Sequence, residues 1–210
     1  MEKLFSLFIV LTLLTSCSKE DSIQIDLSKF DAITEPFPYK NIHTEIAYDY
    51  YELLYATEGS VEERIVSEGN LCAGSTKPDM CIETYNSLET MFGFAGGCLP
   101  SYCFLYIKLQ EGDTNSILNT PEQLLSFLET IDTHSEAILW ANANGYKHSS
   151  TTKEIGAIKE VGDHFELLVS ELVSGCLPVQ TDQVHLRIDS DGKITELERA
   201  VYTYDKKSCI

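Results

Sequence analysis

The sequence predicts an α+β fold in which helices pack on a C-terminal antiparallel β-meander, with disulfides that staple the loops. Two helix signals stand in the middle of the chain, at Thr120 and Thr133, and strand-like segments joined by turn signals follow them. Six of the seven cysteines lie beyond residue 70, an even number that suits three disulfides. A hydrophobic fraction of 43% in 210 residues is sufficient for a folded core.

The chain begins with an apolar segment over residues 4–14, followed by two small residues and Cys17. A signal-peptide core has about 7–15 apolar residues, whereas a membrane-spanning helix needs about 20. The sequence Leu14-Thr15-Ser16-Cys17 resembles the lipobox of bacterial lipoproteins. The resemblance implies that a signal peptide, residues 1–16, is removed and that the acylated Cys17 holds the protein on the membrane. At least two acyl chains are needed for stable attachment.

The residues after Cys17 bear on location and on domain organisation. Ser18-Lys19-Glu20-Asp21 is similar to the signal that sends lipoproteins of Bacteroidota to the outer face of the outer membrane. A solvated tether is often charged in any case, so the sequence does not decide between the cell surface and the periplasmic face of the outer membrane. Charged residues, serine and two prolines over 17–40 predict a tether. Residues 41–210 are then expected to form a single domain with a loop-rich disulfide region at 70–103.

The elements of the first half are expected in this order. Ile46–Ala56 is rich in Tyr and Leu and ends before Gly59, which predicts a helix. Val61–Glu68 fits either a strand or an amphipathic helix, because its period does not decide between them. Phe104–Gln110 follows the loop-rich region and is apolar enough for a strand.

The second half carries stronger local signals. Thr120 followed by Pro121 predicts the start of one helix, and Thr133 with Glu136 forms the capping box of a second helix that ends at Gly145. Four strands are expected after these helices, with turns at Gly162-Asp163 and Asp191-Gly192. The strands are Lys153–Val161, Phe165–Ser174, Val184–Asp189 and Lys193–Tyr204.

The six remaining cysteines are candidates for three disulfides, and six cysteines can be paired in 15 ways. They are Cys72, Cys81, Cys98, Cys103, Cys176 and Cys209. The turn at Asp191-Gly192 places Cys176 opposite residue 207, which favours a Cys176–Cys209 bridge and leaves Cys72–Cys81 and Cys98–Cys103 as local bridges. The repeated Gly-Cys-Leu-Pro sequences at 97–100 and 175–178 suggest a rival pairing between those two segments.

The formal net charge of −18 limits the partners of this protein. A negative field of this size repels phosphate backbones, so we expect no nucleic-acid partner. Acidic glycans and anionic lipid head groups are disfavoured for the same reason. Besides the membrane that Cys17 would contact, a protein or a neutral glycan is the expected partner.

Two short motifs raise the possibility of a metal site. Asp189-Ser190-Asp191-Gly192 has the first acids of a calcium loop but not the later bidentate acid, and the same residues suit a hairpin turn. His134-Ser135-Glu136 matches half of the zinc deaminase signature, without the Pro-Cys-x-x-Cys half. We therefore expect neither a metal nor another cofactor.

The remaining candidates for chemistry are isolated residues. The glycines Gly93, Gly96 and Gly97 are not followed by the Lys-Ser/Thr of a phosphate loop. No Gly-x-Ser-x-Gly elbow occurs, and a Cys–His mechanism would need a free thiolate. No catalytic residue is assigned. The other histidines show no ligand spacing, and they are His43, His148, His164 and His185.

Aromatic residues leave a binding surface conceivable, because Tyr and Trp are favoured at interfaces. Tyr48, Tyr51 and Tyr55 would share one helical face, where core packing is the expected role. The others are Tyr50, Trp140, Tyr146, Tyr202 and Tyr204. The first hypothesis is a non-catalytic, lipid-anchored envelope or cell-surface binding module. The alternatives are a hydrolase that uses paired carboxylates and an acidic inhibitor or immunity protein.

Overall fold

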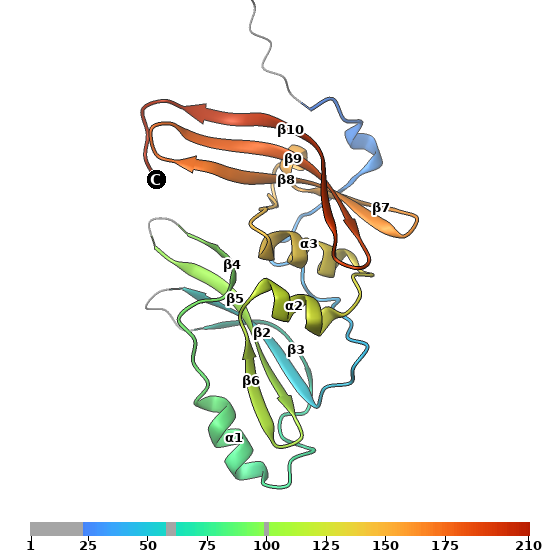
Figure 1. The fold of residues 1–210 in the computed structure, drawn as a ribbon, viewed down its shortest axis with the longest axis vertical. Coiled ribbons are helices and arrows are strands. Elements are labelled where there is room, and N and C mark those ends of the chain that lie inside the picture. The colour runs from blue at the N-terminus through green and yellow to red at the C-terminus, as the bar shows by residue number, and fades with distance from the viewer. Residues whose placement is uncertain (1–22, 58–61, 99–100) are drawn as a thin grey trace, which may run out of the picture.

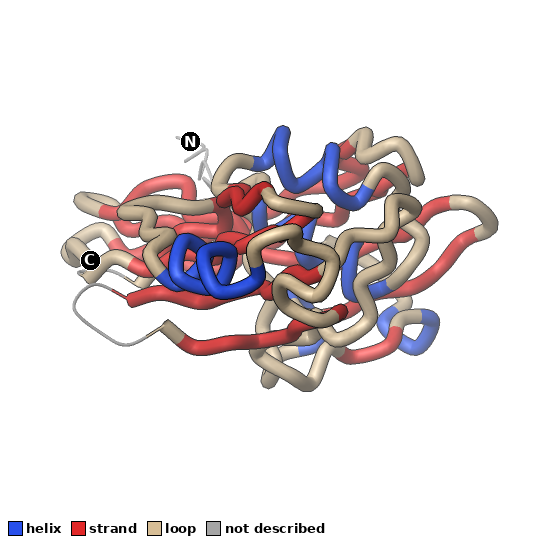
Figure 2. Tube along the Cα trace, turned by 90° about the horizontal axis from the view of Figure 1, so that it is seen from below, coloured by secondary structure: helices blue, strands red, loops and turns tan. Residues whose placement is uncertain are grey.

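The computed structural model describes residues 23–57, 62–98 and 101–210. Two antiparallel sheets of five strands each lie on either side of a pair of short helices (Figure 1). Viewed along a perpendicular direction, strands account for most of the regular structure (Figure 2). The signal segment, Cys17 and the tetrapeptide after it lie outside the described residues.

The C-terminal sheet is the predicted meander, shown in orange and red in Figure 1, with one short strand added at its edge. Its strands follow the order β1-β7-β8-β9-β10. They are β1 (Asp31–Ala32), β7 (Ala157–Val161), β8 (His164–Gly175), β9 (Val179–Asp189) and β10 (Ile194–Asp205). The start of the predicted first strand is instead a 3-10 turn, η2 (Lys153–Ile155).

The N-terminal half forms a second antiparallel sheet, which the sequence analysis did not predict. Its strands follow the order β3-β2-β5-β4, and β6 also pairs with β5. They are β2 (Tyr50–Thr57), β3 (Glu63–Gly69), β4 (Phe94–Gly97), β5 (Cys103–Glu111) and β6 (Thr114–Leu118). The predicted arrangement is therefore matched only in part, because helices do contact the meander but a second antiparallel sheet lies on their other side and most of the regular structure is strand.

The helix predicted over 46–56 is wrong, because β2 occupies this segment. Leu53 pairs with Val66 of β3 on one side and with Ile107 of β5 on the other. A strand in the middle of a sheet with both faces covered has no polar face, so its sequence lacks the alternation that identifies half-buried strands. The tyrosines expected on one helical face lie on a strand or just before it.

The two helices signalled by threonine begin as predicted. In α2 (Pro121–Leu128) and in α3 (His134–Ala143), the N-cap threonine and the residue three positions later complete a capping box. After α3, Gly145 adopts a φ of +93°, as its role at the helix end requires. A further helix, α1 (Pro78–Asn86), lies inside the region expected to be loop-rich. No helix within the described ranges is long and apolar enough to cross a membrane.

The hairpin between β9 and β10 has the predicted register and turn. Ile188 pairs with Ile194, and Gly192 adopts a φ of +82° in the turn. A Cβ atom at Gly192 would lie 2.5 Å from a methyl carbon of Leu125, so the turn packs directly against α2. The indole of Trp140 in α3 donates a hydrogen bond of 2.7 Å to the Gly192 carbonyl. Asp189-Ser190-Asp191-Gly192 is thus a structural turn.

The core is continuous from one sheet to the other. Leu53 and Ile107 in the N-terminal sheet, Leu139 in α3, and Leu167 and Leu186 in the C-terminal sheet are fully buried members of one apolar cluster. Because α3 contacts β4 on one side and β8 on the other, the helices fill the space between the sheets. The two sheets therefore share their largest core.

Part of the segment predicted as a tether, residues 17–40, packs against the sheets, beginning with Ile25. A 3-10 turn, η1 (Leu27–Lys29), precedes Phe30, which is buried on the outer face of the C-terminal sheet with Ala157 and Leu168. Ile33 and Tyr39 are buried in the main core. Prolines and charges had indicated a tether, but the apolar residues between them are packed.

Three disulfides are present: Cys72–Cys81, Cys98–Cys103 and Cys176–Cys209. These are the pairs favoured by the hairpin register, and the rival pairing between 97–100 and 175–178 does not form. Cys176 and Cys209 also form a backbone bridge that continues the β8–β10 meander. The first pair joins α1 to the turn before it, and the second closes the connection from β4 to β5.

Candidate functional site

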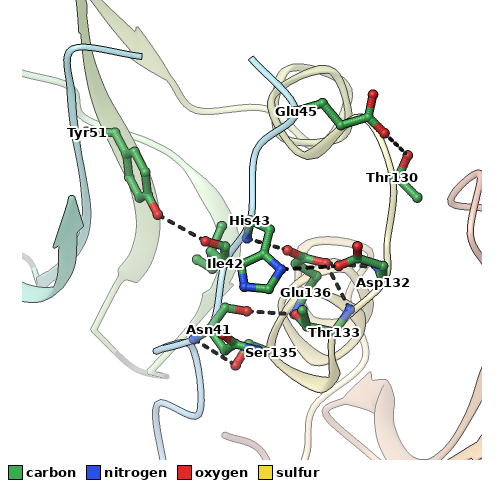
Figure 3. Close-up of polar contacts among 10 residues, drawn as sticks. All are labelled: Asn41, Ile42, His43, Glu45, Tyr51, Thr130, Asp132, Thr133, Ser135 and Glu136. Atoms are coloured by element: carbon green, nitrogen blue, oxygen red, sulfur yellow. Dashed lines mark hydrogen bonds and ion pairs between the residues drawn. The ribbon is translucent and has the colours of Figure 1, made fainter. Parts of the chain in front are cut away.

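The three residues His134-Ser135-Glu136, which match half of the zinc deaminase signature, point their side chains toward different parts of the structure. His134 packs edge-on against Phe165, and Ser135 accepts a hydrogen bond from the Asn41 amide. Glu136 turns instead toward the N-terminal strap, which we define as residues 39–45 (Figure 3). His134 and Glu136 therefore make unrelated contacts and do not form a common metal site.

Glu136 holds the strap on the N-terminus of α3. One carboxylate oxygen accepts the His43 amide at 2.6 Å, and the other accepts the Asp132 and Thr133 amides at 2.9 and 3.0 Å. The Thr133 hydroxyl donates to the Asn41 carbonyl at 2.7 Å (Figure 3). Burial raises the pKa of the Glu136 carboxyl, and the three amides that favour its charged form oppose this shift.

His43, Asp132 and Glu136 place one potential metal ligand each within 4.8 Å of one another. The imidazole of His43 lies 3.6 Å from the Asp132 carboxylate. A cation here would meet three backbone amides that point toward the Glu136 carboxylate, at the positive end of the α3 dipole. This arrangement suits a carboxylate that holds the strap, and it disfavours a metal.

The other residues considered for chemistry are dispersed. His185 contacts Glu166 at 2.6 Å on the outer face of the C-terminal sheet, and His164 lies beside Asp163 at the β7–β8 turn. Gly93 is required because a Cβ atom there would lie 2.1 Å from the Leu105 carbonyl oxygen. Tyr51 is buried and Tyr48 is half-buried, and both rings pack on Phe127. Core packing is thus their role, although they are not on a helix.

The sheet formed by β8, β9 and β10 has two unlike halves. The proximal half (residues 164–170, 183–189 and 194–198) covers the helices with buried apolar side chains. The distal arm (residues 171–182 and 199–210) extends past the helices and is closed by Cys176–Cys209 (Figure 1). Alternation along β9 places Asp182 on the same face as Leu186, which is the inner face of the sheet.

Arg199 organises the inner face where the two halves meet. Its guanidinium contacts Glu171 at 2.6 Å, Glu196 at 2.5 Å and Asp182 at 3.2 Å. The hydrogen bond from Arg199 holds the pKa of the Glu196 carboxyl below its usual range. With three carboxylates around one guanidinium, this surface stays negative and is unsuited to an anionic ligand.

A hollow of about 680 Å³ lies beside this ion cluster. Tyr202 and Tyr204 contribute its aromatic side chains, and Gln180, Asp182 and Arg199 contribute its polar groups. Tyr204 is 51% exposed, so the hollow is open to solvent. Apolar walls with a few polar groups are typical of ligand sites.

Three bulges in the meander each display an apolar side chain. The register skips one residue in β8 and one at each of two places in β10, which leaves Val173, Leu197 and Tyr202 without a cross-strand partner. All three side chains are at least 40% exposed. Bulges redirect side chains, and they recur near functional sites. The exposed apolar residues of the distal arm are Leu172, Val173, Leu177, Val201, Tyr202, Tyr204 and Ile210.

Sequence reasoning named Tyr202 and Tyr204 as candidates but missed Arg199 and the bulges. The predicted hairpin register already placed position 201 near Asp182, so an arginine close to that acid was detectable. The bulges were not, because an extra residue in a strand leaves no distinct mark on its composition.

Comparisons with known proteins assign no family, because no protein-family model, curated protein or solved structure matches the chain. The functional conclusion therefore rests on the arrangement of these residues.

Proposed function

We propose that the protein is a non-catalytic, lipid-anchored envelope module that binds a partner protein through its distal arm. The observation that carries the proposal is the pair of bulges within the arm, which expose the apolar side chains of Val173 and Tyr202. Clustered exposed apolar residues mark interaction surfaces, and tyrosine is favoured at their energetic centres. Anchoring through Cys17 rests on its resemblance to a lipobox.

The arm is suited to docking by its side chains. Edge strands with free backbone groups invite uncontrolled pairing, and bulges and charges are the usual protection. The edge strand β10 has two irregularities and carries Glu196, Glu198 and Arg199. The Cys176–Cys209 bridge fixes the end of the arm, so the exposed side chains are held in place before a partner arrives.

A neutral glycan is the second candidate, favoured by the hollow beside Arg199. An aromatic ring next to carboxylate and amide groups offers both an apolar surface and hydrogen-bond acceptors. Tyr204, Gln180 and Asp182 supply this combination. The negative charge around Arg199 favours a neutral sugar over an acidic one.

The hydrolase and inhibitor alternatives are less well supported. A glycosidase-type acid needs a raised pKa, whereas the Arg199 hydrogen bond lowers the pKa of Glu196. An inhibitor of a basic enzyme would bind through acidic residues, and its affinity would fall steeply with added salt. Docking through the apolar side chains of the arm predicts weak salt dependence.

The proposal is tested by photo-crosslinking on intact cells of the source bacterium. A photoreactive amino acid replaces Tyr202 in one variant and Ile82 of α1 in the control, since both side chains are 40% exposed. We expect a protease-sensitive adduct of discrete mass from position 202 only. Equal adducts from both positions, or none from position 202, would contradict docking at the arm.

Two further measurements separate the remaining parts of the proposal. Glycan-array binding that is lost on Tyr204→Ala, together with no protein adduct, would favour the glycan over the protein. Cys17→Ala should move the protein from the membrane to the soluble fraction, and retention in the membrane would contradict the anchor. Impermeant labelling of intact cells then decides between the cell surface and the periplasmic face.

A further inference from the structure

Lys147 joins the two sheets at a site separate from the distal arm. Its backbone pairs with Ser170 of β8, through two hydrogen bonds of 2.7 Å. Its ammonium reaches across to the N-terminal sheet and donates to the Ala95 carbonyl at 2.8 Å. Ala95 lies where β4 is irregular, between the pairs Phe94–Leu105 and Gly97–Cys103.

A pocket of about 310 Å³ surrounds this contact, at the lower end of the usual range for ligand sites of about 300–1,000 Å³. Phe37 and Tyr39 come from the N-terminal segment, and Tyr55 comes from β2. The rings of Phe37 and Tyr55 lie 5.0 Å apart. The Cys98–Cys103 disulfide and Leu105 complete the apolar part of the lining.

Lys147 has no carboxylate partner in the described part of the chain. The Ala95 carbonyl is the single polar partner of its ammonium there. Burial lowers the pKa of Lys147 to about 8. In a protein with 33 acidic residues and 15 Lys and Arg residues, an ammonium without an acidic neighbour is unexpected. Lys147 is half-buried, and charges that leave water are normally paired, so we infer that the described residues supply this pocket with no anion.

The polar groups beside Lys147 differ in how fully their hydrogen-bonding capacity is used. His148 contacts the Asn142 amide and the Glu35 carbonyl at 3.2 Å each, so both ring nitrogens have partners. Asn142 also donates to the Tyr39 hydroxyl. The Tyr55 hydroxyl contacts the Cys98 sulfur at 2.9 Å, and sulfur is a weak acceptor. Tyr55 can therefore exchange this contact for a stronger acceptor.

We propose that this pocket binds a small organic carboxylate with an apolar body. The carboxylate would pair with the Lys147 ammonium and accept a hydrogen bond from Tyr55, and the apolar body would lie against Phe37 and the disulfide. Hydrogen bonds between an ammonium and a carboxylate are stronger than those between neutral groups, and partial exclusion of water from the pocket strengthens them further. The ligand supplies the anion that the described residues do not.

The test measures binding of butyrate, hexanoate and phenylacetate to the full-length lipoprotein in detergent, by protein-observed NMR. Butanol, hexanol and phenylethanol serve as neutral controls of similar shape. We expect the carboxylates to shift the resonances of Ala95 and His148, and the alcohols to bind at least tenfold more weakly. The absence of carboxylate binding at 10 mM probe, or equal binding of the alcohols, would overturn the proposal.

Two variants and a pH series locate the interaction. Lys147→Met keeps an unbranched side chain and should weaken binding at least tenfold, whereas the exposed Lys193→Met should leave it unchanged. Tyr55→Phe should weaken binding severalfold.

If Lys147→Met does not fold, the unmodified protein still provides a test. Binding should weaken about tenfold per pH unit above the lowered pKa of Lys147. The ionisable groups that line the pocket beside it are His148, Tyr39 and Tyr55. His148 is neutral throughout this pH range, since burial lowers its pKa, and burial raises the pKa of Tyr39. Constant affinity from pH 7 to 9.5 would overturn the assignment to Lys147.

Discussion

The proximal half and the distal arm of the C-terminal sheet are built from the same three strands, yet their inner faces differ completely. In the proximal half, Leu167, Val184 and Leu186 are fully buried against the helices. In the distal arm, the same face carries the Arg199 cluster and Tyr204, which is 51% exposed. Strand pairing continues across the boundary, so hydrogen bonding does not cause the difference.

What changes at the boundary is the layer beneath the sheet. The proximal half rests on α2 and α3, and its side chains gain stability from leaving water. The arm extends beyond those helices, so its stability must come from the strand ladder, the ion cluster and the disulfide. Freed from core packing, its side chains are available for recognition.

The largest expected effect is the difference in unfolding free energy between an alanine substitution in the proximal half and one in the arm. Leu186→Ala in the proximal half should lower the free energy of unfolding by about 2–5 kcal/mol, because it removes a fully buried side chain and leaves a cavity. Val201→Ala in the arm should change it by less than about 0.5 kcal/mol. Urea unfolding of both variants provides the measurement. Similar losses in the two variants would show that the arm is packed like the core.

The second prediction concerns the disulfide that closes the arm. Replacing Cys176 and Cys209 by serine should cost up to about 4 kcal/mol, because the bridge joins residues 33 apart in sequence. Replacing Cys98 and Cys103, which are 5 apart, should cost about 2 kcal/mol.

Denaturant midpoints under oxidising conditions rank the two disulfide variants. For the variant that lacks Cys176–Cys209, hydrogen exchange should show that the lost protection is concentrated in the arm. If exchange instead rises equally in the proximal half, the two halves unfold as a single unit.

The third and smallest effect concerns the ion cluster. Arg199→Met should lower the unfolding free energy by about 1 kcal/mol or less at pH 7, as is usual for partly exposed pairs. Glu196 has a folded-state pKa below the ordinary 4.5, so its stabilising contribution is present above that value and is lost as pH falls through the lowered pKa. The difference between wild type and variant should therefore shrink as the pH falls below 4.5.

Urea midpoints at pH 7, 5 and 3 check this prediction. Arg187→Met is a suitable control because Arg187 forms an ion pair with one carboxylate among the described residues, that of Asp189. A difference that persists unchanged at pH 3 would mean that Arg199 acts through packing of its side chain.

Local signals predicted the second half of the fold well. Thr120 and Thr133 each satisfy backbone donors within three residues, and Asp191-Gly192 forms its turn within four, so neighbouring sequence suffices to identify them. The hairpin register also extended far enough to pair Cys176 with Cys209. These elements depend little on the rest of the molecule.

The elements that sequence missed depend on distant partners. Leu53 lies on a strand because β3 and β5 flank it, and nothing within its own segment shows this. Lys147 gains its environment from β4 and β8 together, and the Arg199 cluster draws acids from three strands. Such sites are formed by residues that are distant in the sequence, and the periodicity of one segment does not show which distant segments will lie beside it.

The contact between the N-terminal strap and α3 has a consequence for the order of folding. The His43 amide meets Glu136 across 93 residues, and β1 pairs with β7. A chain that emerges from its N-terminus must therefore wait for two-thirds of its length before the strap can dock. Long-range contacts of this kind slow folding. Apolar residues such as Phe30 and Tyr39 consequently stay exposed until late in synthesis.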